Sequence, residues 1–263
     1  MDLLKKELAP ISTKSWAEIE KRAQEVLKSQ LSARKAVKVK GPMGWDYTHV
    51  PEGRLEGKEE GNEVKAMNYA ARPLTETRIE FTLDRWELDN IERGAENPDL
   101  GTLEEAAKKI AIYEEEAIYK GNPAIGIKGL DHYSKGNTVK VEEEGSGIMK
   151  AITEASIKLR KKFETPPYVL IAGKKFLEKL NTTVHSYQIT KWINEYIGTE
   201  ILFSFAIENA LMIPQRSSDL ELTIGGDFSI GYQSHDARKV KLFISESFTF
   251  RVLNPEIVVK LEV

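Results

Sequence analysis

The sequence predicts an α+β fold with an arm that projects from it. Helical stripes of apolar residues at 15–31, 102–120 and 148–163 are mixed with strand-like segments, and the two kinds do not alternate regularly. Regular β–α alternation is typical of a doubly wound parallel sheet, so its absence favours α+β. Residues 52–68 are charged and contain glycine, which leaves them little to bury. We therefore expect this segment to extend away from the core.

The composition supports a packed core and sets limits on the partners. Of the 263 residues, 41% are hydrophobic and 30% are charged, which is typical of a folded protein. The net charge of -3 gives no reason to expect a nucleic acid or an anionic membrane as partner. No apolar run approaches the roughly 20 residues that a membrane helix needs, and the first residues, MDLLKKELAP, do not resemble a signal peptide. The chain has no cysteine, which excludes disulfides and thiolate sites and fits a cytoplasmic location.

The first predicted helix has an apolar stripe with two possible uses. Ser15 and Glu18 form a capping-box pattern that predicts its start. The stripe could pack into the core, or part of it could line a groove for a partner peptide. Its members are Trp16, Ile19, Ala23, Val26, Leu27 and Leu31. A short alternating strand is expected at 35–40.

The charged arm at 52–68 leads into a strand. A free loop of this length is uncommon in a compact domain, so the arm is either mobile or an extended hairpin ordered by neighbouring subunits. The strand follows from the alternation of apolar residues with polar ones at Thr77, Ile79, Phe81 and Leu83.

Residues 81–121 form the centre of the predicted fold. We expect an acidic and aromatic turn at 84–92 and then a long helix, Thr102–Lys120. Thr102 and Glu105 form a second capping-box pattern, and Gly121 suits the left-handed residue that ends a helix. Trp86 is flanked by charged residues, so it is either an exposed platform at an interface or a core residue.

The second half of the chain contains further helices and strands. Residues 168–172 (YVLIA) are continuously apolar, which is typical of a strand covered on both faces. Helices are expected at 148–163, 174–180 and 189–197, with a polar loop at 182–188. Further strands are expected at 201–205, 211–213, 220–224, 240–244, 248–252 and 257–263.

A search for catalytic chemistry finds no site. The four histidines lie far apart in the sequence and fit no metal-ligand spacing. Neither a phosphate-binding loop nor a G-x-S-x-G nucleophile motif occurs. We expect no catalytic residue and no metal site, and hence a component of an assembly rather than an enzyme.

The segment FTLDRWELDNIERGAENPDL (81–100) closely resembles the corresponding segment of family 1 encapsulin shell proteins, the linocin or bacteriocin-like family related to tailed-phage major capsid proteins. Further matching segments occur in the family's order and span nearly the whole chain. They are LAP (8–10), GPMGWDY (41–47), GIKGL (126–130), PPYVLI (166–171), GGDFSIGY (225–232) and LFISESFTFRVLNPE (242–256).

This resemblance implies a tailed-phage major-capsid-like fold. Such a fold has a peripheral domain with a spine helix, an extended loop that reaches over a neighbouring subunit, and an axial domain near the symmetry axes. The corresponding ranges are 1–47, 75–130 and 225–263 for the peripheral domain, 48–74 for the extended loop and 131–224 for the axial domain. Subunits of the family close into an icosahedral shell.

The resemblance also implies a cargo and a groove that binds it. Family members form cytoplasmic nanocompartments around a ferritin-like iron-storage protein or a dye-decolorising peroxidase, which is caught by its C-terminal targeting peptide. No cofactor is required for this role. Lys38 stands where some members carry an acid. The residues that match the family's groove are Leu27, Leu31, Arg34, Lys38, Phe228 and Ile230.

Two further sites are implied by the same resemblance. Thr183, His185 and Tyr187 match the loop around the five-fold pore, and Arg78 and Trp86 match the position where some members bind a flavin on the shell exterior. Two alternatives remain open: a prophage capsid protein that packages DNA, and a bacteriocin or peptidase. The chain shows no catalytic triad in support of the second.

Overall fold

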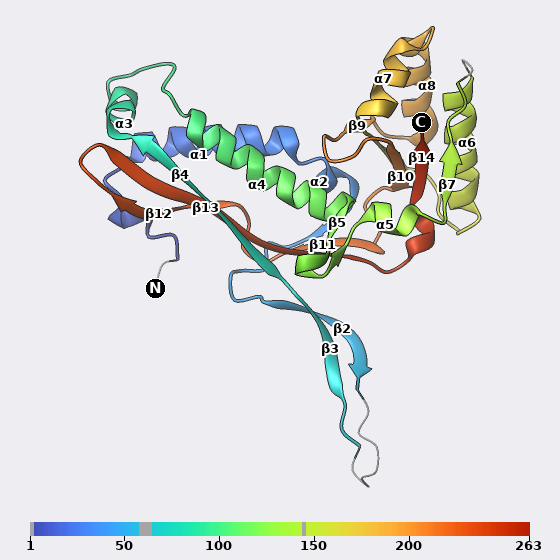
Figure 1. The fold of residues 1–263 in the computed structure, drawn as a ribbon, viewed down its shortest axis with the longest axis horizontal. Helices are drawn as coiled ribbons and strands as arrows, with labels where there is room; N and C mark the ends of the chain where they lie inside the picture. Colours follow the sequence, from blue (N-terminus) through green and yellow to red (C-terminus); the bar gives the residue numbers. More distant parts are fainter. Residues whose placement is uncertain (1–2, 58–64, 144–145) are drawn as a thin grey trace.

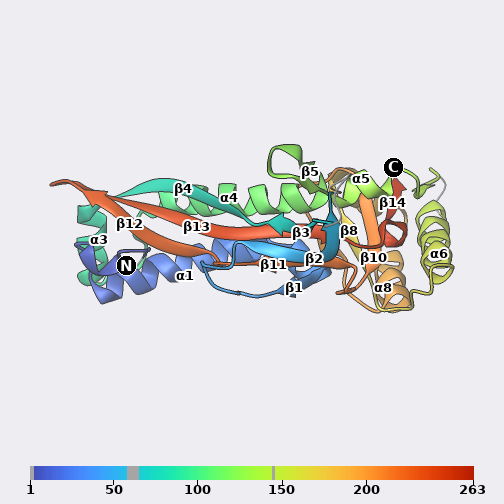
Figure 2. The same cartoon turned by 90° about the horizontal axis from the view of Figure 1, so that it is seen from below.

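A computed structural model describes residues 3–57, 65–143 and 146–263. The molecule is flat, with one sheet and two long helices at one end, a second sheet with shorter helices at the other, and a thin ribbon that projects between them (Figure 1). Figure 2 shows the small thickness of this plate. The predicted α+β class is confirmed, since helices and strands are mixed in both regions.

The N-terminal segment starts with a short 3-10 helix (Lys6–Leu8), followed by α1 (Thr13–Gln30). The prediction that Ser15 caps α1 is wrong. Ser12 is the N-cap, and its side chain accepts a hydrogen bond from the Ser15 backbone N–H. Ser15 lies inside the helix, where its Oγ donates to the Leu88 carbonyl oxygen. The predicted strand at 35–40 is a short helix α2 (Ala33–Ala36) followed by strand β1 (Lys38–Lys40).

The arm is a ribbon of two antiparallel strands, β2 (His49–Glu56) and β3 (Asn68–Pro73). It projects from the body of the molecule, as the sequence predicts (Figure 1). Of the two alternatives, a mobile arm and an extended hairpin, the described part has the form of a hairpin. Residues 58–64 of the predicted arm lie outside the described residues.

The first sheet is built around one long strand, β13 (Lys239–Val252). Strand β4 (Thr75–Asp84) pairs with it on one side, and β11 (Leu220–Ile224) and β12 (Ser229–His235) pair with successive parts of it on the other. The sequence predicts two strands where β13 runs unbroken. Helix α1 packs with the long helix α4 (Gly101–Tyr119) over this sheet, and their apolar faces share its core.

The segment at 84–92 is a helix, α3 (Arg85–Glu92), and the prediction of a turn is wrong. The Asp84 side chain accepts a hydrogen bond from the Trp86 backbone N–H and so caps the helix. Leu88 and Ile91, one helical turn apart, are both buried. The apolar spacing therefore stabilises a helix at a place where the density of charge suggests a turn.

The spine helix α4 (Gly101–Tyr119) joins the two cores. Leu103 and Ile110 belong to the core of the first sheet, while Ile118 and Tyr119 belong to that of the second region. The predicted helix is confirmed, but its cap is wrong: the N-cap is Leu100, without a side-chain cap. The Thr102 hydroxyl instead donates to the Thr82 carbonyl oxygen at 2.8 Å.

The second region contains a five-stranded sheet with the strand order β7-β14-β10-β8-β9. Strand β8 is buried along its whole length, as its apolar sequence predicts. The strands are β7 (Thr138–Lys140), β8 (Tyr168–Ala172), β9 (Leu202–Phe203), β10 (Ala210–Pro214) and β14 (Val259–Glu262). The helices are α5 (Leu130–Ser134), α6 (Gly147–Arg160), α7 (Lys174–Thr182) and α8 (Ser186–Ile197). Two short strands, β5 (Gly121–Asn122) and β6 (Ile127–Lys128), and 3-10 helices Pro123–Ile125 and Pro255–Ile257 complete the chain.

Two strands depart from the expected division into domains. The expected axial range, 131–224, includes β11, which pairs with β13 in the first sheet. The expected peripheral range, 225–263, includes β14, which pairs with β10 and β7 in the second sheet. The last strand thus returns to the region that was expected to be axial, and the domain boundaries themselves stay a prediction. Among the helices that the structure describes, none is long and apolar enough to cross a bilayer.

Candidate functional site

A groove with a volume of about 580 Å³ lies between α1 and the start of β12. Its apolar lining comes from both elements and from Ile244 on β13. Charged side chains, among them Lys21 and Lys28 of α1, line it as well. Five of the six residues predicted for a cargo-peptide site line this groove: Leu27, Leu31, Arg34, Phe228 and Ile230.

The stripe of α1 serves the core and the groove together. Ile19 is fully buried against the sheet, whereas Leu27 and Leu31 keep 9% and 8% of their surface exposed. These two leucines pack in the core of the first sheet and line the groove at the same time. The two alternatives for this stripe, a core face and a groove wall, therefore do not exclude one another.

Arg34 stands at the end of the groove and is held by three carboxylates of its own chain. Its guanidinium donates to Glu114 Oε2 at 2.6 Å, to Asp227 Oδ1 at 2.8 Å and to Glu246 Oε2 at 3.1 Å. The guanidinium also lies 4.6 Å from the ring centre of Phe228. With its donors engaged in this way, Arg34 positions the groove wall instead of offering a free charge to a ligand.

Burial and charge act against each other in this cluster. Burial would lower the pKa of Arg34, but hydrogen bonding to Glu114 and the charges of Glu114 and Asp227 outweigh it and raise the pKa above its ordinary value. Burial, followed by the charge of Glu114, raises the pKa of Glu246 well above its ordinary value. Glu246 Oε1 is buried, and none of the residues that the structure describes forms a hydrogen bond with it. A proton on Glu246 lowers the number of negative charges around Arg34.

Glu115, the neighbour of Glu114 on α4, fixes the segment that follows Leu31. Its Oε1 accepts from the Ala33 backbone N–H at 2.7 Å, and its Oε2 accepts from the hydroxyls of Ser32 at 2.5 Å and Ser204 at 2.9 Å. Burial raises the pKa of Glu115 to about 7, against the opposing effect of these donors. The carboxyl group of Glu115 thus connects the spine helix α4 with the start of α2 and with the loop after β9.

The sequence reading missed both glutamates, although a signal is present. In a helix, residues four positions apart share a face, and Glu114 and Glu115 follow Ile110 and Ala111 at this spacing. Tyr113, an aromatic residue of the same helix, is by contrast 37% exposed. Two acids on the buried face of a helix indicate polar partners on the neighbouring elements.

Lys38 is the predicted groove residue that the structure places elsewhere. It lies on β1, next to β11, is exposed, and does not line the groove. The family resemblance assigns Lys38 to the groove, but the structure does not place it beside the other five residues. A role for Lys38 in peptide binding therefore stays a prediction without support from this geometry.

The predicted pore residues lie at the junction of α7 and α8. Thr183 is the C-cap of α7, His185 is the N-cap of α8 with a left-handed backbone (φ 62°), and Tyr187 is 77% exposed in the first turn of α8. The predicted loop at 182–188 is shorter than expected, because the two helices take up its ends. This junction forms the outer tip of the second region (Figure 1). A pore needs several copies of the chain, so it stays a prediction.

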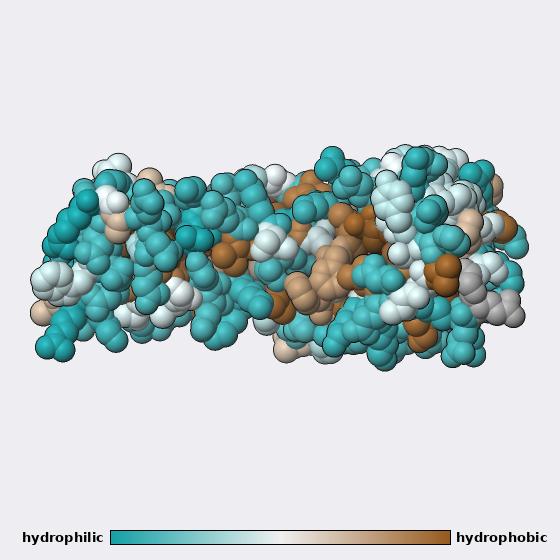
Figure 3. Space-filling view, turned by 90° about the horizontal axis from the view of Figure 1, so that it is seen from above, coloured by the Kyte–Doolittle hydropathy of each residue, from teal (hydrophilic) through white to brown (hydrophobic). Residues whose placement is uncertain are grey.

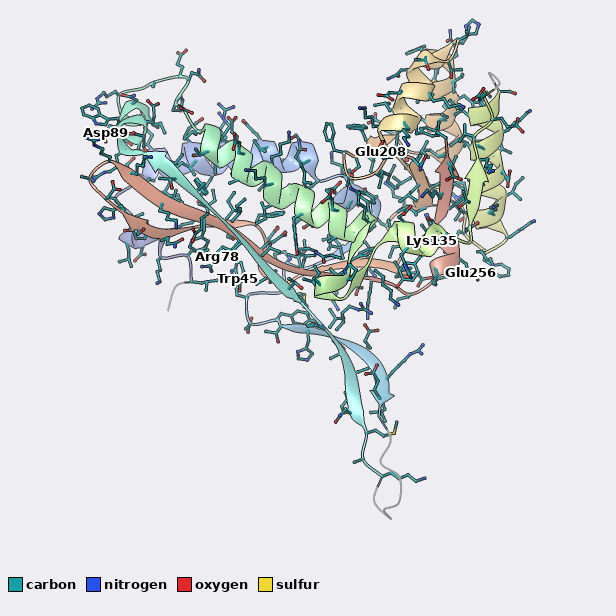
Figure 4. All side chains as sticks on the ribbon, viewed as in Figure 1. Trp45, Arg78, Asp89, Lys135, Glu208 and Glu256 are labelled. Carbon is teal, nitrogen blue, oxygen red and sulfur yellow. The ribbon has the colours of Figure 1, made fainter. Side chains whose placement is uncertain are left out.

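One chain does not bring Arg78 and Trp86 together. Arg78 lies on β4 and stacks on Phe243 at 4.0 Å. Trp86 lies on α3, beyond the end of β4, and is 67% exposed. At the rise of an extended strand, the distance from Arg78 to the end of β4 alone is ~20 Å, and Figure 4 shows Arg78 far from α3, where Asp89 is labelled. Flavin binding by Arg78 and Trp86 therefore stays a prediction, and flavin absorbance after reconstitution is its measurement.

Comparison with known proteins identifies the family. A family model described as "Encapsulating protein for peroxidase" matches residues 1–249. The type 1 encapsulin shell protein of Rhodospirillum rubrum is 39% identical over 272 residues, which cover 99% of this chain and 96% of the relative.

The chain belongs to the type 1 encapsulin shell family.

Other members and the solved structures agree with this assignment. The type 1 encapsulin shell protein of Rhodococcus erythropolis is 35% identical and covered in full, with 99% of this chain aligned. The virus-like particle of Pyrococcus furiosus matches with a TM-score of 0.65 at 15% identity, over 94% of this chain and 98% of that one. The capsid of the phage XM1 matches with a TM-score of 0.58 at 12% identity, over 88% and 90%. These structural neighbours confirm the tailed-phage capsid fold, and the sequence relatives favour an encapsulin over a prophage capsid.

Proposed function

We propose that copies of this encapsulin shell protein assemble into a closed icosahedral compartment and that the groove between α1 and β12 captures a cargo enzyme. The captured part is the cargo's C-terminal targeting peptide, which would lay short apolar side chains against Leu27, Leu31 and Ile230. The observation that carries this proposal is the groove itself, in which five residues from distant parts of the sequence meet.

The physical form of the groove fits an extended or helical peptide. Leucine and isoleucine side chains supply an apolar floor, and polar groups along the groove orient the ligand; this is the usual division between affinity and orientation in peptide recognition. Lys6 and Glu20 form an ion pair across one side of the groove. A peptide with two or three apolar residues between polar ones would match this pattern.

The family description supports a peroxidase as the cargo class. It names proteins that encapsulate a peroxidase, and a dye-decolorising peroxidase is one of the two cargo classes that the sequence resemblance implies. A ferritin-like iron-storage protein is the other. The proposed capture acts on a short peptide and would be the same for either enzyme.

Capture of a tagged reporter tests this proposal. A fluorescent protein that carries the C-terminal peptide of a candidate peroxidase is expressed together with the shell protein, and the same fluorescent protein without the peptide serves as the control. We expect fluorescence to co-elute with the shell only when the peptide is present. Equal retention of both reporters would contradict specific capture.

A further inference from the structure

Strand β9 and the loop after it expose two apolar residues and bury a polar one. In a strand, alternate residues face opposite sides, and the apolar ones normally face the core. Here Ser204 is 2% exposed, whereas its neighbours Phe203 and Phe205 are 37% and 69% exposed. The usual alternation is inverted: a serine faces the interior, and two phenylalanines face outwards.

Hydrogen bonds fix this inverted arrangement. The Ser204 backbone N–H donates to the Ala172 carbonyl oxygen at 3.1 Å, and its hydroxyl donates to Glu115 at 2.9 Å. The same hydroxyl oxygen accepts from the Ala206 backbone N–H at 3.2 Å. A shift by one residue would bury a phenylalanine but would break all three bonds. The display of the two rings is therefore set by the interior of the protein.

The two phenylalanine rings form one rigid apolar feature. Their centres are 4.6 Å apart, and their planes meet at 81°, the edge-to-face arrangement that aromatic pairs favour. Exposed apolar residues that occur singly need no explanation, but a pair fixed by buried polar groups indicates a contact surface.

Strand β9 and the loop after it lie on a narrow edge of the plate. Strand β9 is seen between α4 and α7, and Glu208 of the loop is labelled close by (Figures 1 and 4). Figure 3 looks onto this edge and shows hydrophobic surface near its middle. The broad sides of the plate are seen in Figure 1, and its small thickness in Figure 2.

We propose that Phe203 and Phe205 form an apolar contact with a second copy of this chain in the shell wall. The inference rests on the proposed assembly into a closed shell. In a wall one molecule thick, the two broad sides of each plate face the lumen and the exterior, so only the edges can meet neighbouring copies. An apolar pair on an edge is thus expected to be covered by another subunit.

The proposed cargo peptide binds in the groove and not at Phe203 and Phe205. The groove is lined by α1, by the start of β12 and by Ile244, and none of its lining residues comes from the loop after β9. Cargo in the groove would leave Phe203 and Phe205 uncovered. The two surfaces can therefore be tested independently.

Substitution of Phe205 tests the contact. Phe205→Asp puts a charge into the proposed interface, whereas Phe205→Leu keeps an apolar side chain and serves as the matched control. Both variants retain Ser204 and its hydrogen bonds. By size-exclusion chromatography and negative-stain microscopy, we expect closed particles for the wild type and for Phe205→Leu, and at least a tenfold loss of particles for Phe205→Asp. Equal particle yields for all three proteins would overturn the inference.

Photo-crosslinking gives a second test that does not depend on the folding of the aspartate variant. A benzoyl-phenylalanine at position 205 is irradiated in the assembled wild-type background. We expect a covalent dimer of two shell chains on a denaturing gel. Irradiation that yields only monomer, or only an adduct with cargo, would overturn the inference. A wild-type chain that forms no particles at all would instead overturn the proposed function, so the two failures are distinguishable.

Discussion

At the scale of single residues, Leu31 combines two roles that usually belong to different side chains. It ends the apolar stripe of α1, packs in the core, and lines the groove. Lys38, a few residues later, was predicted for the same site but points elsewhere on β1. Leu31 and Lys38 therefore allow a comparison between a residue that lines the groove and one that only the family resemblance assigns to it.

Leu31→Ala should weaken peptide binding, while Lys38→Ala should not. Loss of apolar contact of this size corresponds to about 1–2 kcal/mol, or roughly a five- to thirtyfold weaker Kd. Titration of a fluorescent targeting peptide onto assembled shells measures both variants. Particle formation by Leu31→Ala controls for its partial burial. An unchanged Kd for Leu31→Ala, or a weakened one for Lys38→Ala, would contradict the assignment of the groove.

Glu115→Gln should change how stability depends on pH. Burial raises the pKa of Glu115 from 4.5 to about 7, so the folded protein holds this proton more tightly than the unfolded chain does. The resulting stabilisation is present below pH 4.5 and is lost as the pH rises to about 7. A shift of this size corresponds to about 3 kcal/mol. Glutamine keeps the shape of the side chain and does not titrate.

Urea unfolding of dissociated wild-type and Glu115→Gln subunits at pH 4.5 and pH 8 measures this effect. The free energy of unfolding of the wild type, relative to that of the variant, should fall by about 3 kcal/mol between the two conditions. Groups that the two proteins share contribute equally to both and cancel. A difference that is constant with pH would mean that Glu115 does not titrate in this range.

The residues that sequence reasoning recovered are those whose signal is local. The α1 stripe follows from its spacing. For Trp86 the sequence left an exposed and a core position open, and the structure shows the exposed one. Glu115 could not be assigned in this way, because its three donors come from Ser32, Ala33 and Ser204, all of which are far from it in the sequence. Five residues of the groove came from the family resemblance, and a sequence pattern alone could not bring α1 and β12 together.

At the scale of elements, the ribbon β2–β3 projects from the body of its own chain and gains little stability from it. An isolated two-stranded ribbon is only marginally stable in water. Leu55 and Tyr69 are paired across its two strands, and their side chains are 50% and 85% exposed. The chain leaves this apolar pair uncovered, which fits a ribbon that a neighbouring subunit stabilises.

Hydrogen exchange should therefore depend on assembly in this ribbon. We expect the backbone amides of β2 and β3 to exchange at least tenfold more slowly in assembled particles than in dissociated subunits. Strand β8, which is fully buried within its own chain, is the internal control and should change little. Equal exchange of the ribbon in both states would show that neighbouring copies do not cover it.

Elements with a continuous local pattern were predicted from the sequence, whereas contacts between distant segments were not. Helix α4 and strand β8 were predicted because their apolar patterns are continuous. Helix starts were misplaced where two capping residues compete, as Ser12 and Ser15 do. The pairing of β14 with β10 and β7 was missed, because pairing between distant strands leaves no mark in a local window.

At the scale of the whole molecule, a flat subunit with an apolar edge and a projecting ribbon has the form of a building block. The spine helix contributes buried residues to both cores and so connects the two ends of the plate. The groove is lined by α1 and β12, and the aromatic pair belongs to β9 and the loop after it, so the proposed cargo capture and the proposed wall contact use separate surfaces. We therefore expect a shell to form with or without cargo.

Microscopy of the chain expressed alone tests directly whether this protein assembles into a closed shell. Purified protein is separated by size-exclusion chromatography and imaged in negative stain, and its mass is compared with the 29.7 kDa of one chain. We expect hollow, closed particles of uniform diameter with icosahedral symmetry. A monomer or a small oligomer as the only species would contradict it.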